Sequence, residues 1–217
     1  MSCARDTPAF SCHLELSKAA FCLLASVMSA LVLIRHGAAI DKDVDATQPL
    51  SQEGQAQAEF VGNALAAYLE LPSEFLPTLA QGTPCAVTVW HSDKERARGT
   101  ASTVTQILTA AGCNVTQSTA TGDVLSPNAD PVEAKALIAS STSPLIVCVG
   151  HLPHLQRLAL TLGVEATVDA FTPAGGVLLH DRGGKWSIAH MIGHGLNWWV
   201  RGASIYEPDT SDVEDVS

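Results

Sequence analysis

Leu31-Val32-Leu33-Ile34-Arg35-His36-Gly37 is the stretch from which the fold of this chain is predicted. Four apolar residues, two of them β-branched, run directly into Arg35 and His36. A continuous apolar run of this length is typical of a strand buried on both faces in a parallel α/β sheet. Gly37 frees the backbone where the strand becomes a loop. Because ligands bind beyond the carboxyl ends of such strands, we expect Arg35 and His36 to lie at a binding site.

The two side chains that end this strand suit phosphate chemistry. Arg35 carries a permanent charge and a planar fork of donors that matches phosphate oxygens. His36, as a neutral imidazole, is a competent nucleophile or base near pH 7. Arg-His-Gly alone is a weak signal, because a strand can end in these residues by chance.

Two further apolar runs bring polar residues to the same edge of the predicted sheet. Residues 87–92 precede a helical pattern that has Arg96 in its first turn, and residues 145–150 are followed by His151. Free N–H groups and the helix macrodipole favour an anion at the first turn of a helix. Arg96 lies there, so we expect Arg96 rather than Arg98 to bind the phosphate. For Arg98 we expect a surface salt bridge. His91 is expected to be a strand-end residue.

Helix starts and a hairpin are also visible in the sequence. Ser51 is predicted to cap a helix that ends near Leu71-Pro72, and Ser92-x-x-Glu95 predicts a capping box. Residues 175–190 form two strand patterns around a glycine-rich turn, which predicts a hairpin. After residue 151, apolar residues recur at helical spacing and predict a helix with one buried face. We expect His154 to face the solvent or the rim of the site.

Length and charge limit the classes of function. The chain has 217 residues, 47% of them hydrophobic, which fits one domain with a substantial core. Its formal net charge is -10, with no basic face, so a nucleic acid is a poor partner. Arg35 and Arg96 would still create a local positive pocket. Residues 207–217 are acidic and lack Lys and Arg, and we expect them to be a disordered tail.

Cysteine and histidine spacing gives no sign of a metal or a redox motif. The six cysteines contain no C-x-x-C pair, and Cys148 lies inside an apolar strand, where it is expected to be a small buried hydrophobe. His180, His190 and His194 follow no zinc pattern and are expected to be ordinary strand or loop residues. Nothing demands an oxidising compartment, so we expect a cytoplasmic protein with no metal and no cofactor.

The first thirty residues have two interpretations. Lys18 and the apolar run after it resemble a secretory signal, and Ala30 would fit a cleavage site. Cleavage there would leave the first core strand at the extreme terminus. We therefore expect translation to start at Met28, residues 1–27 to be an upstream extension, and the folded domain to span 28–206.

Five ordered sequence pieces resemble the histidine phosphatase superfamily, the phosphoglycerate mutase-like fold, and within it the SixA-type phosphohistidine phosphatase branch. The pieces are Arg35-His36-Gly37-x-Ala39, Pro49-Leu50-Ser51-x-x-Gly54, Ser92-x-x-x-Arg96-Ala97-x-x-Thr100-Ala101, Leu125-Ser126-Pro127-x-x-Asp130 and Gly150-His151-Leu152-Pro153. They cover residues 28 to 190. Many SixA-type members carry an arginine where this chain has Gln48, which leaves substrate details open.

The resemblance implies a three-layer α/β/α sandwich, with a mostly parallel sheet, helices on both faces and a C-terminal hairpin. It further implies that His36 attacks phosphorus and becomes transiently phosphorylated. Arg35, Arg96 and His151 would surround the phosphoryl oxygens. No cofactor or metal is implied.

A general acid is not evident in the sequence. Asp123, Asp130 and Glu133 are the candidates, and Asp130-Pro131-x-Glu133 is sufficiently explained as a helix cap. An alkoxide leaving group needs a proton, whereas a protonated phosphohistidine leaves as neutral imidazole. The absence of a clear acid therefore favours phosphoramidates, such as phosphohistidine, or other activated substrates over sugar phosphates.

Three functions remain in competition at this point. The first is an intracellular phosphohistidine phosphatase of signal transduction, acting on a phosphorylated protein such as a histidine-phosphotransfer domain. The second is a phosphomonoesterase for a small phosphorylated metabolite. The third is a non-catalytic phosphate- or phosphoprotein-binding module. We expect a monomer, with neither a nucleic acid nor a membrane as partner.

Overall fold

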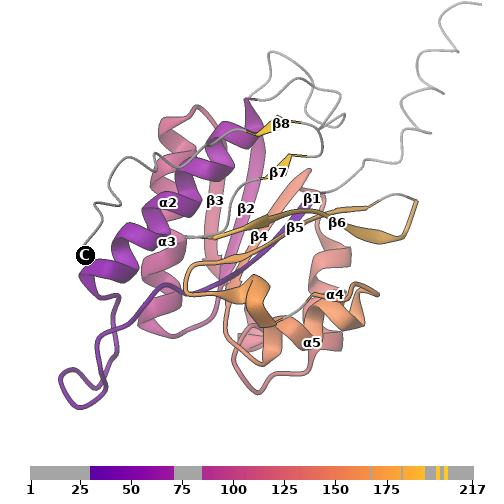
Figure 1. Ribbon diagram of the computed structural model, residues 1–217. Coiled ribbons are helices and arrows are strands. Elements are labelled where there is room, and N and C mark those ends of the chain that lie inside the picture. Colours follow the sequence, from indigo (N-terminus) through magenta and orange to yellow (C-terminus); the bar gives the residue numbers. More distant parts are fainter. Residues whose placement is uncertain are drawn as a thin grey trace, which may run out of the picture.

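A six-stranded sheet forms the centre of the molecule, with strand order β3-β2-β4-β1-β5-β6 (Figure 1). The computed structural model describes residues 30–70, 85–166, 168–181, 183–193, 199–200 and 203–204. The strands of the sheet are β1 (Ala30–Arg35), β2 (Ala86–His91), β3 (Asn114–Thr119), β4 (Leu145–Gly150), β5 (Gly176–Asp181) and β6 (Trp186–Ile192). Strands β3, β2, β4 and β1 are parallel, and β5 and β6 add an antiparallel hairpin. The predicted hairpin and mostly parallel sheet are therefore confirmed.

The strand that opened the sequence analysis is the central one. Strand β1 lies between β4 and β5, and residues 31–34 have no exposed surface. Their side chains alternate between the two faces of the sheet, with Leu31 and Leu33 in one core cluster and Val32 and Ile34 in the other. Burial on both faces explains why this run is apolar at every position.

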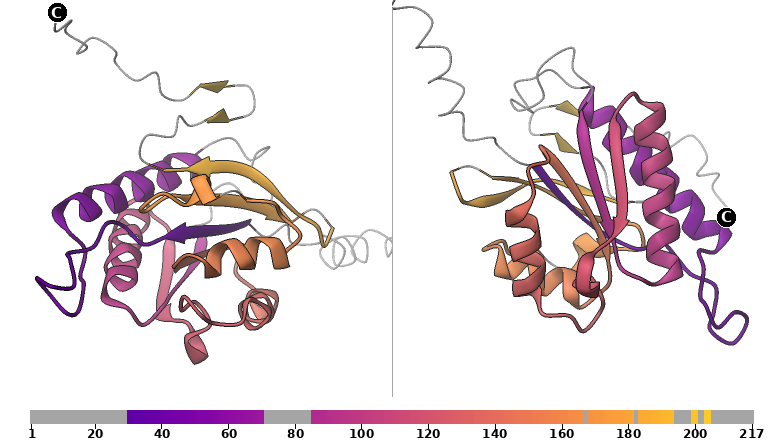
Figure 2. Two further views of the ribbon diagram at one scale, coloured as in Figure 1. Left: turned by 60° about the horizontal axis from the view of Figure 1, so that its bottom comes forward. Right: turned by 180° about the vertical axis from the view of Figure 1, so that it is seen from behind.

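Helices cover both faces of the sheet, which gives the expected three layers (Figure 2). One face carries α2 (Gln52–Leu69) and α3 (Glu95–Ala110), and the other carries α4 (Pro131–Ser140) and α5 (His154–Thr161). The 3-10 turns η1 (Thr121–Asp123) and η2 (Val168–Phe171) connect elements. A small separate pair, β7 (Trp199–Val200) and β8 (Ala203–Ser204), is antiparallel.

Two of the three predicted caps are confirmed. Ser51 accepts a hydrogen bond from the N–H of Gly54 and begins α2. Asp130 accepts one from Val132, and Pro131 is the first residue of α4. The capping box at Ser92 is wrong, because α3 begins at Glu95 and its N-cap has no side-chain hydrogen bond. Ser92 lies in the loop before the helix, where its hydroxyl has another partner.

Cysteines in the described part are all thiols. Cys148 is buried in β4, as expected, while Cys85 and Cys113 are partly exposed. Among the described residues, no group of three or more His, Cys, Asp or Glu side chains could hold a metal ion. Within the same residues, no helix combines the length and apolar character needed to cross a bilayer.

Several predictions concern residues outside the described part. They are the upstream extension at 1–27 with its alternative as a signal, the acidic tail at 207–217, and His194. The domain limits 28–206 consequently remain a prediction.

Candidate active site

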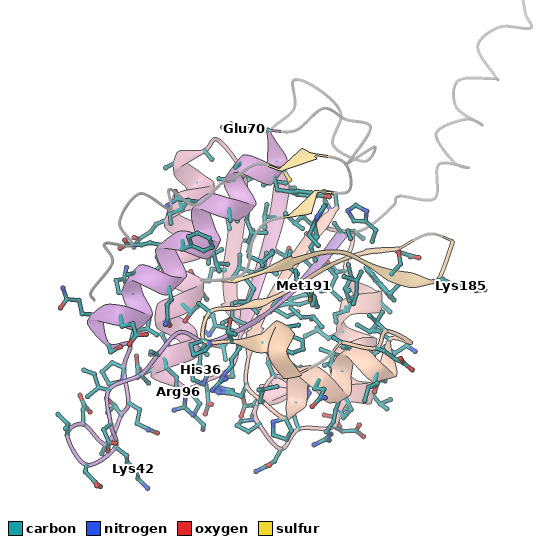
Figure 3. The ribbon with its side chains drawn as sticks, viewed as in Figure 1. His36, Lys42, Glu70, Arg96, Lys185 and Met191 are labelled. Carbon is teal, nitrogen blue, oxygen red and sulfur yellow. The ribbon has the colours of Figure 1, made fainter. Side chains whose placement is uncertain are left out.

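Three of the four predicted site residues meet at the carboxyl edge of the parallel strands (Figure 3). His36 follows β1, Arg96 is the second residue of α3, and His151 follows β4. The ring centroids of His36 and His151 are 4.8 Å apart, with the planes tilted by 55°. The Nε of Arg96 donates to Nε2 of His36 at 3.1 Å. Side chains separated by more than a hundred positions thus share one small volume.

The protonation state of the His36 ring follows from its hydrogen bonds. Its Nδ1 lies 2.8 Å from the carbonyl oxygen of Gly37, which can only accept, so Nδ1 carries the hydrogen. Nε2 faces the Arg96 donor and therefore holds a lone pair. Both neighbours require the same neutral tautomer, and that tautomer presents Nε2 as a nucleophile.

Burial and charge keep both rings neutral. Burial, followed by the charges of Arg96 and Arg35, lowers the pKa of His36 to about 4, while the hydrogen bond to Gly37 opposes the shift. Burial and then His36, Arg96 and Lys94 lower the pKa of His151 to about 3, while Asp93 opposes the shift. At neutral pH, both rings are consequently uncharged, and Nε2 of His36 keeps the lone pair that accepts the hydrogen bond from Arg96.

Close packing of two backbone segments fixes the loop that carries His36. A Cβ at Gly37 would lie 2.6 Å from the carbonyl oxygen of Gly54, which leaves room for glycine alone. The N–H of Gly37 donates to the hydroxyl of Thr100, which in turn donates to the carbonyl of Arg96. The loop after β1 and the first turn of α3 are therefore connected directly.

Ser92 orients His151. Its hydroxyl lies 2.6 Å from Nε2 of His151, and both residues are buried. Nδ1 of His151 is buried without a hydrogen-bond partner among the described residues. When the hydroxyl donates to Nε2, Nδ1 carries the hydrogen and is a free donor for a ligand oxygen. Sequence reasoning assigned Ser92 to a helix cap and missed this role, because the two residues are far apart in the chain.

Arg35 is the last residue of β1 and acts on His36 through its charge. One terminal nitrogen of Arg35 donates to the carbonyl oxygen of Phe171 at 3.2 Å, and the charge of Arg35 acts on the His36 ring. Burial lowers the pKa of the Arg35 and Arg96 side chains, which stay charged at neutral pH. Arg96 and the two neutral imidazoles therefore lie together at Nε2, and the charge of Arg35 acts on the same ring.

The other arginine and histidine candidates have structural roles. Arg98 pairs with Glu95 at 2.7 Å on the surface, as expected. His91 ends β2 and is buried, with its Nδ1 2.8 Å from the carbonyl oxygen of Ser92. The expectation that His154 faces the solvent or the rim is wrong. Its ring has no exposed surface, because it is the first residue of α5, which packs against the sheet.

Each of the three acidic candidates has a contact of its own, and two of them belong to a helix start. Asp130 caps α4, and Glu133 lies in the first turn of that helix. One carboxylate oxygen of Asp123 is 3.4 Å from the N–H of Asp93. Within the described part of the chain, His36 and His151 form their side-chain hydrogen bonds with Gly37, Arg96 and Ser92, and none of these partners is a carboxylate.

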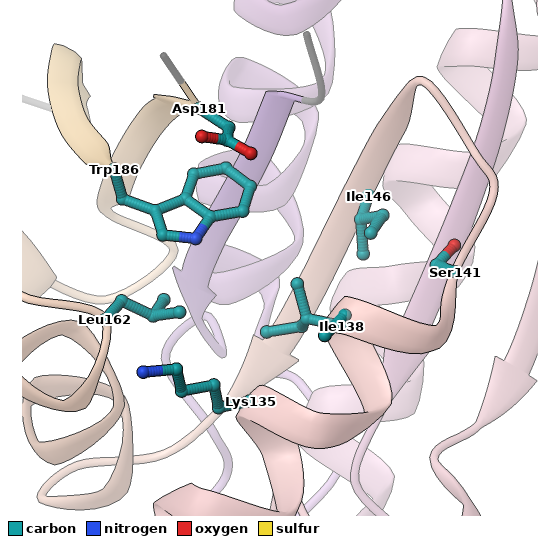
Figure 4. Close-up of a pocket in the computed structure, with 8 residues that line it drawn as sticks. Lys135, Ile138, Ser141, Ile146, Leu162, Asp181 and Trp186 are labelled. Carbon is teal, nitrogen blue, oxygen red and sulfur yellow. The ribbon is translucent and has the colours of Figure 1, made fainter. Parts of the chain in front are cut away.

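A cavity of about 260 Å³ lies toward the opposite edge of the sheet (Figure 4). It is lined by Lys135, Ile138, Ala139, Ser141, Ile146, Leu162, Asp181 and Trp186. Its polar groups already have protein partners: Lys135 donates to the carbonyl of Thr161, and Asp181 accepts from the N–H of Gly184. This cavity is separate from the histidine cluster, because Ile146 lies near the start of β4 and His151 lies beyond its end.

Comparison with known proteins rests on solved structures. No family model and no curated protein matches the sequence significantly. The protein histidine phosphatase SixA in complex with tungstate matches with a TM-score of 0.56 at 19% identity, over 76% of this chain and 96% of that one. The putative phosphohistidine phosphatase SixA from Agrobacterium tumefaciens matches with a TM-score of 0.53 at 22% identity, over 77% and 99%. The fold is that of the SixA phosphatases. The SixA fold accounts for the described sheet and its two helical layers, and the activity of this chain is considered next.

Proposed function

We propose that the protein is a phosphatase that uses His36 as a nucleophile and proceeds through a phosphohistidine intermediate. The observation that carries this proposal is the His36 ring itself. Its Nδ1 hydrogen is committed to Gly37, and its Nε2 lone pair faces the guanidinium of Arg96. A neutral nucleophile beside a fixed cation is what attack on a phosphoryl group requires.

The reaction divides into two displacements at phosphorus. Nε2 of His36 forms a bond to phosphorus while the bond to the leaving group breaks, and the leaving group keeps that electron pair. A water molecule then attacks the phosphorylated His36, releases phosphate and restores the neutral ring. Arg35, Arg96 and Nδ1–H of His151 stabilise the charge that builds on the phosphoryl oxygens.

The substrate we propose is phosphohistidine on a signalling protein, such as a histidine-phosphotransfer domain. Two of the three acidic candidates, Asp130 and Glu133, belong to the start of α4. A protonated phosphohistidine does not need a general acid, because its imidazole leaves as a neutral molecule. An alcohol leaving group would need a proton from elsewhere.

Trapping the intermediate tests the nucleophile. Wild-type protein mixed with a ³²P-labelled phosphohistidine protein should acquire an acid-labile, alkali-stable label, and His36→Ala should not. His91→Ala is the matched control, since this histidine lies nearby but bonds only to a backbone carbonyl. Label on the His36→Ala protein would disprove the assignment, and binding without turnover would favour a phosphoprotein-binding module.

Comparing substrates tests the specificity. Wild-type protein should hydrolyse a phosphohistidine protein with a higher kcat/KM than any member of a panel of sugar phosphates. The substrate assignment fails if sugar phosphates are preferred by orders of magnitude. The nucleophile assignment would survive that result, because the labelling experiment reports on it separately.

A further inference from the structure

A single guanidinium group bridges His36 and Gln48, a loop residue to which the sequence analysis gave no role. Arg96 donates from Nε to His36 and from a terminal nitrogen to Oε1 of Gln48, at 3.1 and 3.2 Å. With two of its three nitrogens bound in this way, the plane of the guanidinium is fixed relative to the His36 ring. The contact to Gln48 crosses 48 positions and joins the loop before α2 to α3.

The backbone of Gln48 is in an unfavourable conformation. Its φ is 49°, in the left-handed region that glycine and asparagine tolerate much better than glutamine. The N–H of Gln48 donates to the carbonyl of Asp45, and the bridge between Ala39 and Leu50 closes the loop on both sides. Strained residues concentrate where the surrounding structure holds them for a function. Here the strain coincides with a hydrogen bond to a site cation.

We propose that Gln48 is a positioning residue that holds Arg96 in the orientation needed to bind a phosphoryl group. This inference rests on the proposed function. The amide oxygen is neutral, so it fixes the direction of the guanidinium without neutralising its charge. A carboxylate in the same place would compete with the phosphoryl oxygens for Arg96, whereas a shorter amide would leave Arg96 without this partner.

Two substitutions separate the length of the side chain from its charge. Gln48→Glu keeps the length and adds a negative charge, and Gln48→Asn keeps the amide, shortens it and suits a positive φ. The probe is tungstate, a tetrahedral oxyanion, measured by calorimetry and as an inhibitor of p-nitrophenyl phosphate hydrolysis. We expect Gln48→Glu to weaken tungstate binding about tenfold, and Gln48→Asn to lower kcat about threefold to tenfold with Tm unchanged or raised.

A double-mutant cycle decides whether the effect passes through Arg96. In an Arg96→Ala background, Gln48→Glu should change tungstate affinity by less than about twofold. The proposal is overturned if Gln48→Glu leaves tungstate affinity unchanged in the presence of Arg96, or if its full effect persists without Arg96. A wild-type protein that binds tungstate but hydrolyses nothing would disprove the proposed function, while the cycle would still test Gln48.

A second, independent feature is a pair of thiols at the opposite edge of the sheet. Cys85 and Cys113 immediately precede β2 and β3, whose first residues Ala86 and Asn114 are in register. The N–H of Asn114 donates to the carbonyl of Cys85 at 2.8 Å, so the pairing extends to the cysteines. Both side chains pack against the same core cluster, and each thiol acts on the pKa of the other.

We infer that Cys85 and Cys113 are a site of disulfide formation. Neighbouring strands lie about 4.8 Å apart, within the Cα separation of about 4.4–6.8 Å that a disulfide spans. The oxidant is of the azo or disulfide class: the two thiols lose two electrons and two protons, the S–S bond forms, and an N=N bond becomes HN–NH or a disulfide becomes two thiols. Burial raises the pKa of Cys85 to about 12, so the reaction is slow at neutral pH.

Mass spectrometry of the full chain tests this inference. After treatment with diamide, the intact mass should fall by two hydrogens, and peptide mapping should link Cys85 to Cys113. The closed loop contains α3, so Tm should rise by about 5–10 °C relative to the reduced protein. Cys113→Ser, the matched control, should lose both effects. Recovery of both cysteines as thiols, or a link from Cys85 to another cysteine, would refute the site.

Discussion

Polar groups at the two edges of the sheet differ in whether they have hydrogen-bond partners within the protein. At the carboxyl edge, Nδ1 of His151 is buried without a partner, and the pKa values of His36 and His151 are lowered. At the other edge, Lys135 and Asp181 line a cavity with their hydrogen-bonding groups paired to the backbone. A buried donor without a partner costs stability, so Nδ1 of His151, beside a histidine of lowered pKa, marks a place where a ligand can supply the missing hydrogen bond.

The largest effect is expected when one cation is removed from each edge of the sheet in turn. Arg96→Ala should lower kcat by about 100- to 1,000-fold, because a fixed donor to the developing charge is lost. Lys135→Ala, the matched change at the cavity, should leave kcat within about twofold, since Lys135 bonds only to a backbone carbonyl. Equal losses in steady-state hydrolysis by the two variants would remove the distinction between the edges.

The next test uses His154, a buried histidine that the proposed mechanism does not use. Burial first, and then Arg157, lower its pKa from 6.5 to about 4, so the unfolded chain binds a proton in that interval and the folded protein does not. Stability from this group is therefore complete above pH 6.5 and declines as the pH falls toward 4, by about 2 kcal/mol between pH 7 and pH 5. In urea unfolding, His154→Phe should lose less stability than wild type over this range.

His36 and His151 also have lowered pKa values and contribute with the same sign. The difference between wild type and His154→Phe isolates the contribution of one ring. Parallel losses of stability in the two proteins would contradict the assignment to His154.

A smaller effect is expected from the residue that orients His151. Ser92→Ala removes the hydroxyl from Nε2, so the ring loses its fixed tautomer while remaining in place. We expect kcat to fall about tenfold with little change in KM. Ser92→Thr, which retains a hydroxyl, should recover part of the rate. A KM effect alone would instead indicate a role in substrate binding.

The smallest effect concerns the pH dependence of the rate. His36 must be neutral to attack, and its pKa is about 4. The value of kcat/KM should therefore be level from pH 7 to about 5 and halve near pH 4, after correction for ionisation of the substrate. NMR titration of the His36 ring provides the direct measurement. A midpoint near 6.5 would show that burial and the two arginines do not act on the ring.

Much of the fold was predictable because local patterns and burial agree in it. Continuous apolar runs predicted β1 and β4, and capping residues predicted the starts of α2 and α4. The prediction failed at Ser92, where a side chain that suits a cap bonds a histidine from another strand instead. It failed again at His154, because one turn of helix decides whether a polar residue faces water or the core.

The sequence alone determined the kind of fold and the residues at the ends of the strands, including the adjacent Arg35 and His36. It could do so because strand burial and helix capping act over a few neighbouring residues. Tertiary structure alone decided the tautomer of His36, the partner of His151, the contact from Gln48 to Arg96 and the approach of Cys85 to Cys113. These features depend on distances between segments far apart in the chain, which strand order and register set and which no local pattern records.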